Sequence, residues 1–205
     1  AEYLKASNDF IAKTRTLLPN WFGALPAYKM EVIREPSFSE VPGGAAHAAP
    51  PSPDGTRPGR TWVHLAGVTD DPAAMYTLMC HEAMPGHVTQ GDIQVRQSGG
   101  PKFRKSYGYV AFSEGWALYA EWLMADLGYM DDPGNRMGLL DGQSMRAARV
   151  VLDVGFHCGF EAPELVGGGQ WDYDKAWAFL THYVNVPSDT TFDYVASRWA
   201  NPLWR

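Results

Sequence analysis

The stretch His81-Glu82-Ala83-Met84-Pro85-Gly86-His87 does most to decide the fold of this chain. Two imidazoles and a carboxylate occur within seven residues, and neutral imidazoles are common protein ligands for zinc. The common zinc-binding spacing, H-E-x-x-H, puts both histidines on one face of a helix. Here they are six residues apart, so on a regular helix His87 would lie about a third of a turn away from the face of His81.

The Pro85-Gly86 pair could distort the helix so that the two histidines meet despite their six-residue spacing. Proline has no N–H to donate to the carbonyl of His81, and glycine tolerates a bulged backbone. We therefore expect a local wide turn in the helix that returns His87 to the side of His81, with Glu82 placed to activate water. The alternative is that both histidines make ordinary hydrogen bonds, because short motifs also occur by chance.

A second segment, residues 111–123, is typical of a helix rich in alanine, leucine and aromatic residues, with Ser113 as its N-cap. Glu114 and Glu121 are two helical turns apart and therefore share a face. Because two carboxylates on a face suited to burial are costly without a cation, we expect Glu114 to be a third metal ligand. Glu121 would then accept a hydrogen bond from one of the metal-binding histidines and so orient its ring. Alternatively, Glu114 only favours the helix N-terminus electrostatically.

A third helix, predicted over residues 145–156 and followed by His157, carries a ladder of charges. Arg149, Asp153 and His157 follow one another at four-residue spacing and share a face. Asp153 would fix the tautomer of His157, which could then donate to the oxyanion that forms when water attacks a carbonyl. Arg149 or Arg146 could bind a substrate carboxylate. The alternative is an exposed ladder of little energetic value, but the apolar neighbours favour partial burial.

These three segments resemble the DUF885 family (domain of unknown function 885), a group of presumed zinc metallopeptidases of the gluzincin type. The family's motifs are similar to H-E-A-x-P-G-H-H, F-x-E-G-W-A-L-Y-A-E and R-A-A-R-x-V-x-D-x-G-x-H, and all three occur here in the same order. The resemblance covers nearly the whole chain, but only the C-terminal portion of a typical member. It implies zinc held by His81, His87 and Glu114, with Glu82 as the general base.

The chain departs from this family in three places. Val88 replaces a second histidine, and Ala46-His47-Ala48 stands where the family usually carries aromatic residues. Near the C-terminus, the family motif W-P-G-Q-A-x-x-Y is replaced by residues 186–194. Tyr194 is the candidate for the motif's tyrosine, although the spacing differs by one, and would join His157 at the oxyanion. Substrate contacts on these stretches therefore stay open.

Composition bounds the remaining possibilities. A length of 205 residues, 45% hydrophobic and 20% charged, is typical of one globular domain over residues 1–205. A net charge of −6 argues against nucleic acid as the main partner, and no apolar run approaches the roughly 18 residues of a membrane span. Cys80 and Cys158 are expected to be small buried side chains. Neither oligomeric state nor compartment, cytoplasmic or exported, follows from the sequence.

The expected fold class is α+β, predominantly α-helical: a zincin-like metallopeptidase catalytic domain with a small β-sheet edge beside the site. Two short strands, over residues 28–34 and 61–66, are expected to pair, and the second could bind an extended peptide as an added strand. Residues 37–60 are expected to form a long loop. Helices are expected at the N-terminus, in the three motif segments, and in a last hairpin over residues 172–183 and 189–199.

Together these patterns predict a hydrolase of peptide bonds that uses one zinc ion and a peptide as substrate. The chain would be the C-terminal catalytic portion of a longer protein, whose remainder could complete the cleft. Two alternatives stay open: a zinc-dependent hydrolase of non-peptide amides or esters, and a catalytically inert zinc-binding structural fragment.

Overall fold

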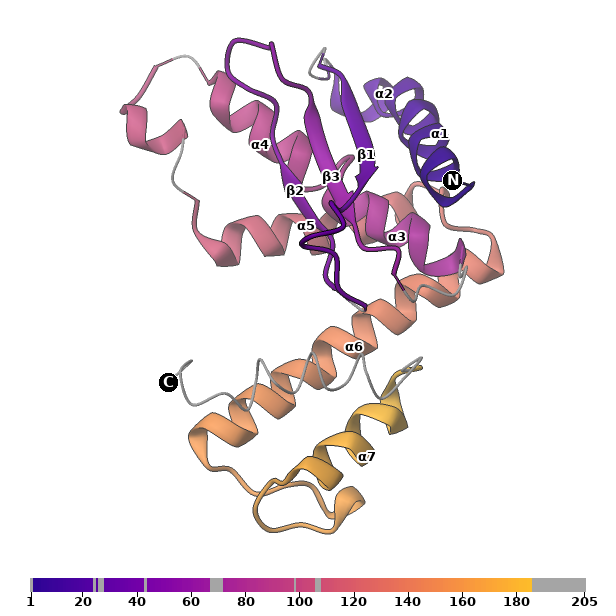
Figure 1. Ribbon diagram of the computed structural model, residues 1–205, viewed down its shortest axis with the longest axis vertical. Coiled ribbons are helices and arrows are strands. Elements are labelled where there is room, and N and C mark those ends of the chain that lie inside the picture. The colour runs from indigo at the N-terminus through magenta and orange to yellow at the C-terminus, as the bar shows by residue number, and fades with distance from the viewer. Residues whose placement is uncertain are drawn as a thin grey trace.

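The computed structural model describes residues 2–23, 25, 28–42, 44–66, 72–97, 99–105 and 108–185. This part of the chain is mostly helical and contains one small sheet (Figure 1). The strands are β1 (Met30–Arg34), β2 (His47–Ala49) and β3 (Gly59–Val63). The helices are α1 (Glu2–Leu17), α2 (Pro19–Phe22), α3 (Pro72–Glu82), α4 (His87–Arg96), α5 (Val110–Asp126), α6 (Pro133–Cys158) and α7 (Tyr173–Tyr183), with 3-10 turns η1 (Lys102–Lys105) and η2 (Glu164–Val166). The α+β class is confirmed.

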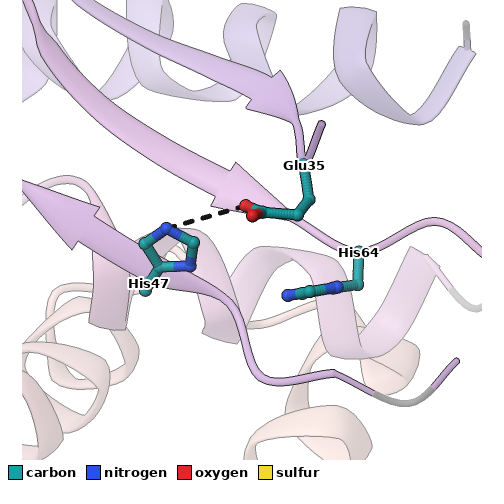
Figure 2. A group of neighbouring side chains, drawn as sticks. All are labelled: Glu35, His47 and His64. Atoms are coloured by element: carbon teal, nitrogen blue, oxygen red, sulfur yellow. Dashed lines mark ion pairs between the residues drawn. The ribbon is translucent and has the colours of Figure 1, made fainter. Parts of the chain in front are cut away.

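The three strands lie in the order β1-β3-β2, with β1 parallel to β3 and β2 antiparallel to it. The predicted pairing of the first two strands is therefore confirmed. The prediction that the strand over residues 61–66 offers a free edge is wrong, because β3 lies in the middle. The three-residue strand β2, inside the predicted loop, takes the edge instead. At one end of the sheet, Glu35, His47 and His64 come together (Figure 2).

The sheet is covered by α1 on one side and approached by α4 on the other (Figure 1). Val32 and Val63 are buried against α1 and α3, where their apolar cluster also contains Ile11, Met75 and Met79. This packing seats α3, the helix that carries the first histidine, directly on the sheet. Burial of each large apolar side chain stabilises the fold by about 1.5–3 kcal/mol.

Helix α6 is longer than predicted, since it begins at Pro133 rather than near residue 145. The Asp132 side chain accepts hydrogen bonds from the backbone N–H groups of Gly134 and Asn135 and caps the helix, and Gly159 ends it at a φ of 68°. Its first half packs near α3 and α5 through the buried Leu139. Its second half packs on α7 through a separate apolar cluster (Figure 1).

The two cysteines have different surroundings. Cys80 is buried in a core cluster with Leu18 and Met84, and burial raises the pKa of its thiol well above the ordinary value. Cys158 is exposed at the end of α6, so the prediction of burial is right for Cys80 and wrong for Cys158. The predicted helix over residues 189–199 lies outside the described residues. Among the residues that the structure does describe, no helix has the length and apolar character of a membrane span.

Candidate metal centre

His81 and His87 lie on two separate helices rather than on one bulged helix. Helix α3 ends at Glu82, residues 83–86 form a tight connection with a cis Met84-Pro85 bond, and α4 begins at His87. The expected bulge is therefore wrong, although its consequence, that the two imidazoles meet, is right: the ring centroids are 4.8 Å apart. The chain turns so sharply that a Cβ on Gly86 would lie 1.7 Å from the His81 carbonyl oxygen, so this position requires glycine.

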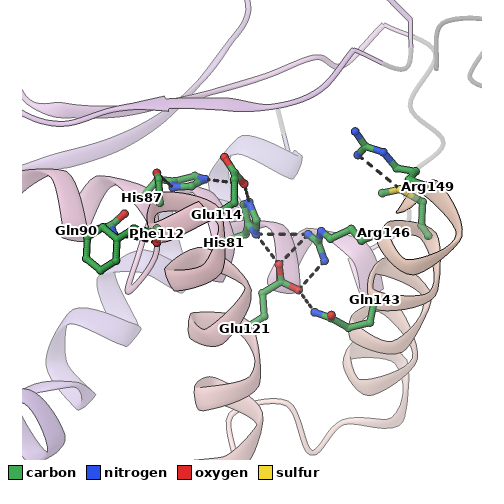
Figure 3. A network of polar contacts seen from close by, with 11 residues as sticks. His81, His87, Gln90, Phe112, Glu114, Glu121, Gln143, Arg146 and Arg149 are labelled. Atoms are coloured by element: carbon green, nitrogen blue, oxygen red, sulfur yellow. Dashed lines mark hydrogen bonds and ion pairs between the residues drawn. The ribbon is translucent and has the colours of Figure 1, made fainter. Parts of the chain in front are cut away.

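Helix α5 brings Glu114 to the two histidines (Figure 3). One carboxylate oxygen, Oε2, lies 3.4 Å from His81 Nε2 and 3.6 Å from His87 Nε2. These separations are long for direct hydrogen bonds. By contrast, two ligands on a tetrahedral zinc, each about 2.0–2.1 Å from the ion, lie about 3.3 Å apart. Both distances from the carboxylate to the imidazoles are thus close to what one zinc ion requires, and all three donor atoms lie within 4.8 Å of one another.

The other nitrogen of each imidazole has a partner of its own. His81 Nδ1 lies 2.7 Å from Glu121 Oε1, and His87 Nδ1 lies 3.3 Å from Ser113 Oγ. When Nδ1 carries the proton that it donates to these partners, Nε2 is left as a lone pair facing Glu114. This is the tautomer that a metal-binding histidine needs, and a carboxylate behind the ring is the usual way to fix it. The residues fit zinc.

Glu121 is completely buried, with an exposed fraction of 0%, and it is the centre of a polar network (Figure 3). Its carboxylate accepts hydrogen bonds from Thr77 Oγ1 at 3.0 Å and Gln143 Nε2 at 3.1 Å, in addition to His81. Two guanidinium nitrogens of Arg146 lie 2.7 and 3.0 Å from its oxygens. The buried charge is therefore paired and fully hydrogen-bonded, as its burial requires.

Glu82, the residue after the first histidine, lines the same cleft and is 7% exposed. Burial, together with the negative charges of Glu114 and Glu121, raises the pKa of its carboxyl group to about 7. The positive charges of His81 and Arg146 act in the opposite direction. A carboxylate with such a pKa can both accept and return a proton near neutral pH, which is what a general base and acid must do.

The pKa of His87 is lowered, first by burial and then by the neighbouring His81, while Glu114 opposes the shift. A lowered pKa favours the neutral imidazole, the form that binds metal. Trp116 Nε1 donates a hydrogen bond of 2.9 Å to the Pro85 carbonyl and so ties the connection between the two histidine helices to α5.

The centre opens into a cleft between three parts of the chain. The segment around β2 forms one side, and the ends of α3, α4 and α5 carry the metal-ligand candidates. On the third side, α6 contributes Met145, Arg146 and Arg149. Strand β2 is an edge of the sheet, and no strand in the described part of the chain pairs with its outer side.

The other predicted site residues differ in where they lie. Arg146 and Arg149 both line the cleft, and Arg146 is also paired with Glu121, so their contact with substrate stays a prediction. His157 does contact Asp153, with Nδ1 3.1 Å from the carboxylate. The His157 side chain is 25% exposed and that of Asp153 is 56% exposed, so the expected partial burial is right for His157 and wrong for Asp153. His157 lies about 12 Å of helix rise beyond Arg149. The structure therefore does not bring it to the centre. Tyr194 lies outside the described residues.

Several residues of the centre were missed or misassigned. Thr77 precedes His81 by four residues and Gln143 precedes Arg146 by three, so helical spacing alone could have placed both beside the network. Ser113 was expected to be an N-cap; the N-cap of α5 is Tyr109, and Ser113 faces His87 instead. No local pattern indicated the bond from Trp116 to Pro85, because it joins segments 31 residues apart.

Comparisons with known proteins bear on this arrangement. The profile of a family described as "Bacterial protein of unknown function (DUF885)" matches residues 1–196. The chain is also similar to "the crystal structure of the putative lipoprotein from Colwellia psychrerythraea", with a TM-score of 0.80 and 28% sequence identity. That match covers 97% of this chain and 33% of the Colwellia protein, so this chain spans about a third of its length. No curated protein matches the chain.

Proposed function

This chain belongs to the DUF885 family, and from that premise we propose that it is the catalytic portion of a zinc-dependent hydrolase of peptide bonds, with a zincin-like fold of the gluzincin type. The observation that carries the proposal is the spacing of His81, His87 and Glu114 beside a buried Glu82. Their donor atoms all lie within 4.8 Å of one another, and both imidazoles present Nε2 to the same oxygen of Glu114.

His81, His87 and Glu114 would hold the zinc ion. The bound ion would supply Lewis-acid activation of water and of the substrate carbonyl. Glu82 takes a proton from the attacking water and delivers it to the leaving amine, a role for which its pKa of about 7 is suited. Glu121 and Ser113 keep both imidazoles in the tautomer that binds metal, because each accepts a hydrogen bond from the N–H at Nδ1.

A peptide is the substrate class that the cleft favours. Strand β2 borders the cleft as the edge of the sheet, so an extended peptide could pair with it and pass in front of the three ligand candidates. Arg149 lines the opposite side and could bind a carboxylate of the substrate. Ala46, Ala48 and Pro50 give the β2 side small side chains, which leave room for those of a bound peptide.

The substitution Glu82→Gln tests the proposal. Because glutamine keeps the shape but cannot accept the proton, we expect turnover of peptides to fall by about 10²–10⁴-fold. Zinc content and the denaturation midpoint should stay at the wild-type values. Glu164→Gln, which changes an exposed carboxylate on η2 outside the cleft lining, is the matched control and should keep full activity.

The same assay separates the alternatives. Blocked and unblocked peptides are compared with simple acyl-amides and esters, using both this chain and the full-length protein. Turnover confined to the amides and esters would replace the peptide assignment. A zinc-loaded chain that is inert beside an active full-length protein would make this region a structural part of the site. As a further part of the proposal, the lipoprotein description of the Colwellia protein favours an exported location.

A further inference from the structure

A second cluster of metal-binding side chains lies where the three strands meet at one end of the sheet. Strands β1 and β3 are parallel, so the residues that follow them, Glu35 and His64, emerge at the same end. Strand β2 is antiparallel and starts there, with His47 opposite Trp62 of β3. Figure 2 shows the carboxylate and the two rings turned toward one another.

Glu35 is the buried member of this cluster, with an exposed fraction of 8%. Ser39 Oγ donates a hydrogen bond of 2.6 Å to its Oε1. The other oxygen, Oε2, is buried without a hydrogen-bond partner, and it lies 3.6 Å from His47 Nε2. A buried anionic oxygen that lacks a donor is costly unless a cation or a water molecule meets it.

Both histidines are held in position by their surroundings. The His47 ring stacks on Trp62, with centroids 5.0 Å apart and planes inclined by 8°. His64 Nδ1 accepts a hydrogen bond of 3.1 Å from the Val41 backbone N–H. Gly44 packs so closely that a Cβ there would lie 2.6 Å from the His64 ring. The Trp62 stack and the close approach of Gly44 fix the positions of the two rings before any ligand arrives.

We propose that Glu35, His47 and His64 form a second site for a divalent transition-metal ion, with zinc as the probe. The three donor atoms lie within 4.8 Å of one another, and two imidazoles with one carboxylate are donors suited to zinc. The ion neutralises Oε2 of Glu35. Coordination through His64 Nε2 would move the ring proton to Nδ1 and would replace the hydrogen bond from the Val41 N–H.

Such an ion would cross-link the three strands beside the cleft. It would join the start of the edge strand β2, part of the cleft lining, to the ends of β1 and β3. The second site is independent of the proposed hydrolysis, since it shares no residue with the centre at His81, His87 and Glu114. A water molecule in place of the ion is the alternative, and the stoichiometry of zinc binding distinguishes the two.

The test is equilibrium dialysis of the metal-free chain against buffered free zinc, followed by elemental analysis of bound zinc. We expect two equivalents for the wild type and one for each of Glu35→Gln, His47→Ala and His64→Ala. The matched control is His157→Ala, which removes an imidazole outside both clusters and should keep two equivalents. Far-UV circular dichroism of every variant checks that it is folded, and the near-isosteric Glu35→Gln guards against misfolding of the histidine variants.

Each outcome decides something different. A wild-type chain that takes up one equivalent, retained in His47→Ala and Glu35→Gln, overturns the second site and leaves the first. Two equivalents that survive in all three variants also overturn it. One equivalent that is lost in His47→Ala but kept in His87→Ala supports the second site while the proposed catalytic centre fails.

Discussion

Replacing Glu121 with glutamine perturbs the candidate metal centre without touching a proposed ligand. The carboxylate is fully buried and satisfies four donor side chains: His81, Thr77, Gln143 and Arg146. An amide keeps the volume of the carboxylate but has one acceptor oxygen in place of two. Its NH2 group would face the N–H and O–H donors that surround Glu121, so at least one of them would lose its acceptor. The amide also leaves the Arg146 guanidinium without its counter-charge.

The expected cost follows from this geometry. Breaking a buried ion pair by removing one partner destabilises a protein by about 3–5 kcal/mol. The Arg146 side chain is 23% exposed, so water can partly solvate it, and we expect the lower end, about 3 kcal/mol. This is a large fraction of the roughly 5–15 kcal/mol by which a domain is stable. Because His81 also loses the acceptor that fixes its tautomer, zinc affinity should fall by about 10–100-fold.

Two measurements check the prediction. Urea denaturation of the metal-free protein, followed by tryptophan fluorescence, gives the change in the free energy of unfolding. Competition with a chromophoric chelator gives the zinc affinity. Glu161→Gln, an exposed carboxylate between α6 and η2, serves as the control and should match the wild type in both. If Glu121→Gln were also within about 0.5 kcal/mol of the wild type, with unchanged zinc affinity, the network would not support the centre as described.

Three further predictions concern other parts of the structure. Gly86→Ala should abolish tight zinc binding, because its Cβ would lie 1.7 Å from the His81 carbonyl oxygen and force residues 83–86 out of their present turn. Chelator competition measures the zinc affinity, and an unchanged affinity would contradict the described turn. Arg34 and two backbone N–H groups lower the pKa of Glu40 to about 2, below its ordinary 4.5, so its contribution to stability is complete above about pH 4.5 and is lost as pH falls toward 2. The urea midpoint of Glu40→Gln should therefore depend less on pH between 5 and 2 than that of the wild type, and parallel curves would refute the assignment. Leu152→Ala, in the α6–α7 core, should lower the free energy of unfolding by about 2–5 kcal/mol while zinc affinity stays the same; a loss of zinc binding would show that the two regions are coupled.

The sequence predicted the centre best where regular helical spacing applies. Glu114 and Glu121 are seven residues apart on an uninterrupted helix, so their shared face could be inferred directly, and the structure brings both to His81. The connection before His87 was harder, because proline and glycine permit both a bulge and a complete break. The close approach of Gly86 to the His81 carbonyl shows which of the two the chain adopts, and the residue types alone do not specify it.

The failures have a common physical origin in contacts between distant segments. The ladder to His157 was read correctly as a helical face, but α6 is long and carries that face away from the cleft. Strand β2 has only three residues and lies between proline-rich turns, so no alternating pattern reveals it. For the same reason the meeting of Glu35, His47 and His64 could not be predicted, since it depends on the register of three strands.

The most direct test of the account is anomalous X-ray scattering at the zinc edge, from crystals of the chain purified and grown without added metal. The account predicts a peak about 2.0–2.2 Å from Nε2 of His81, Nε2 of His87 and a carboxylate oxygen of Glu114. Crystals soaked in zinc that still lack anomalous density among these three side chains would contradict it.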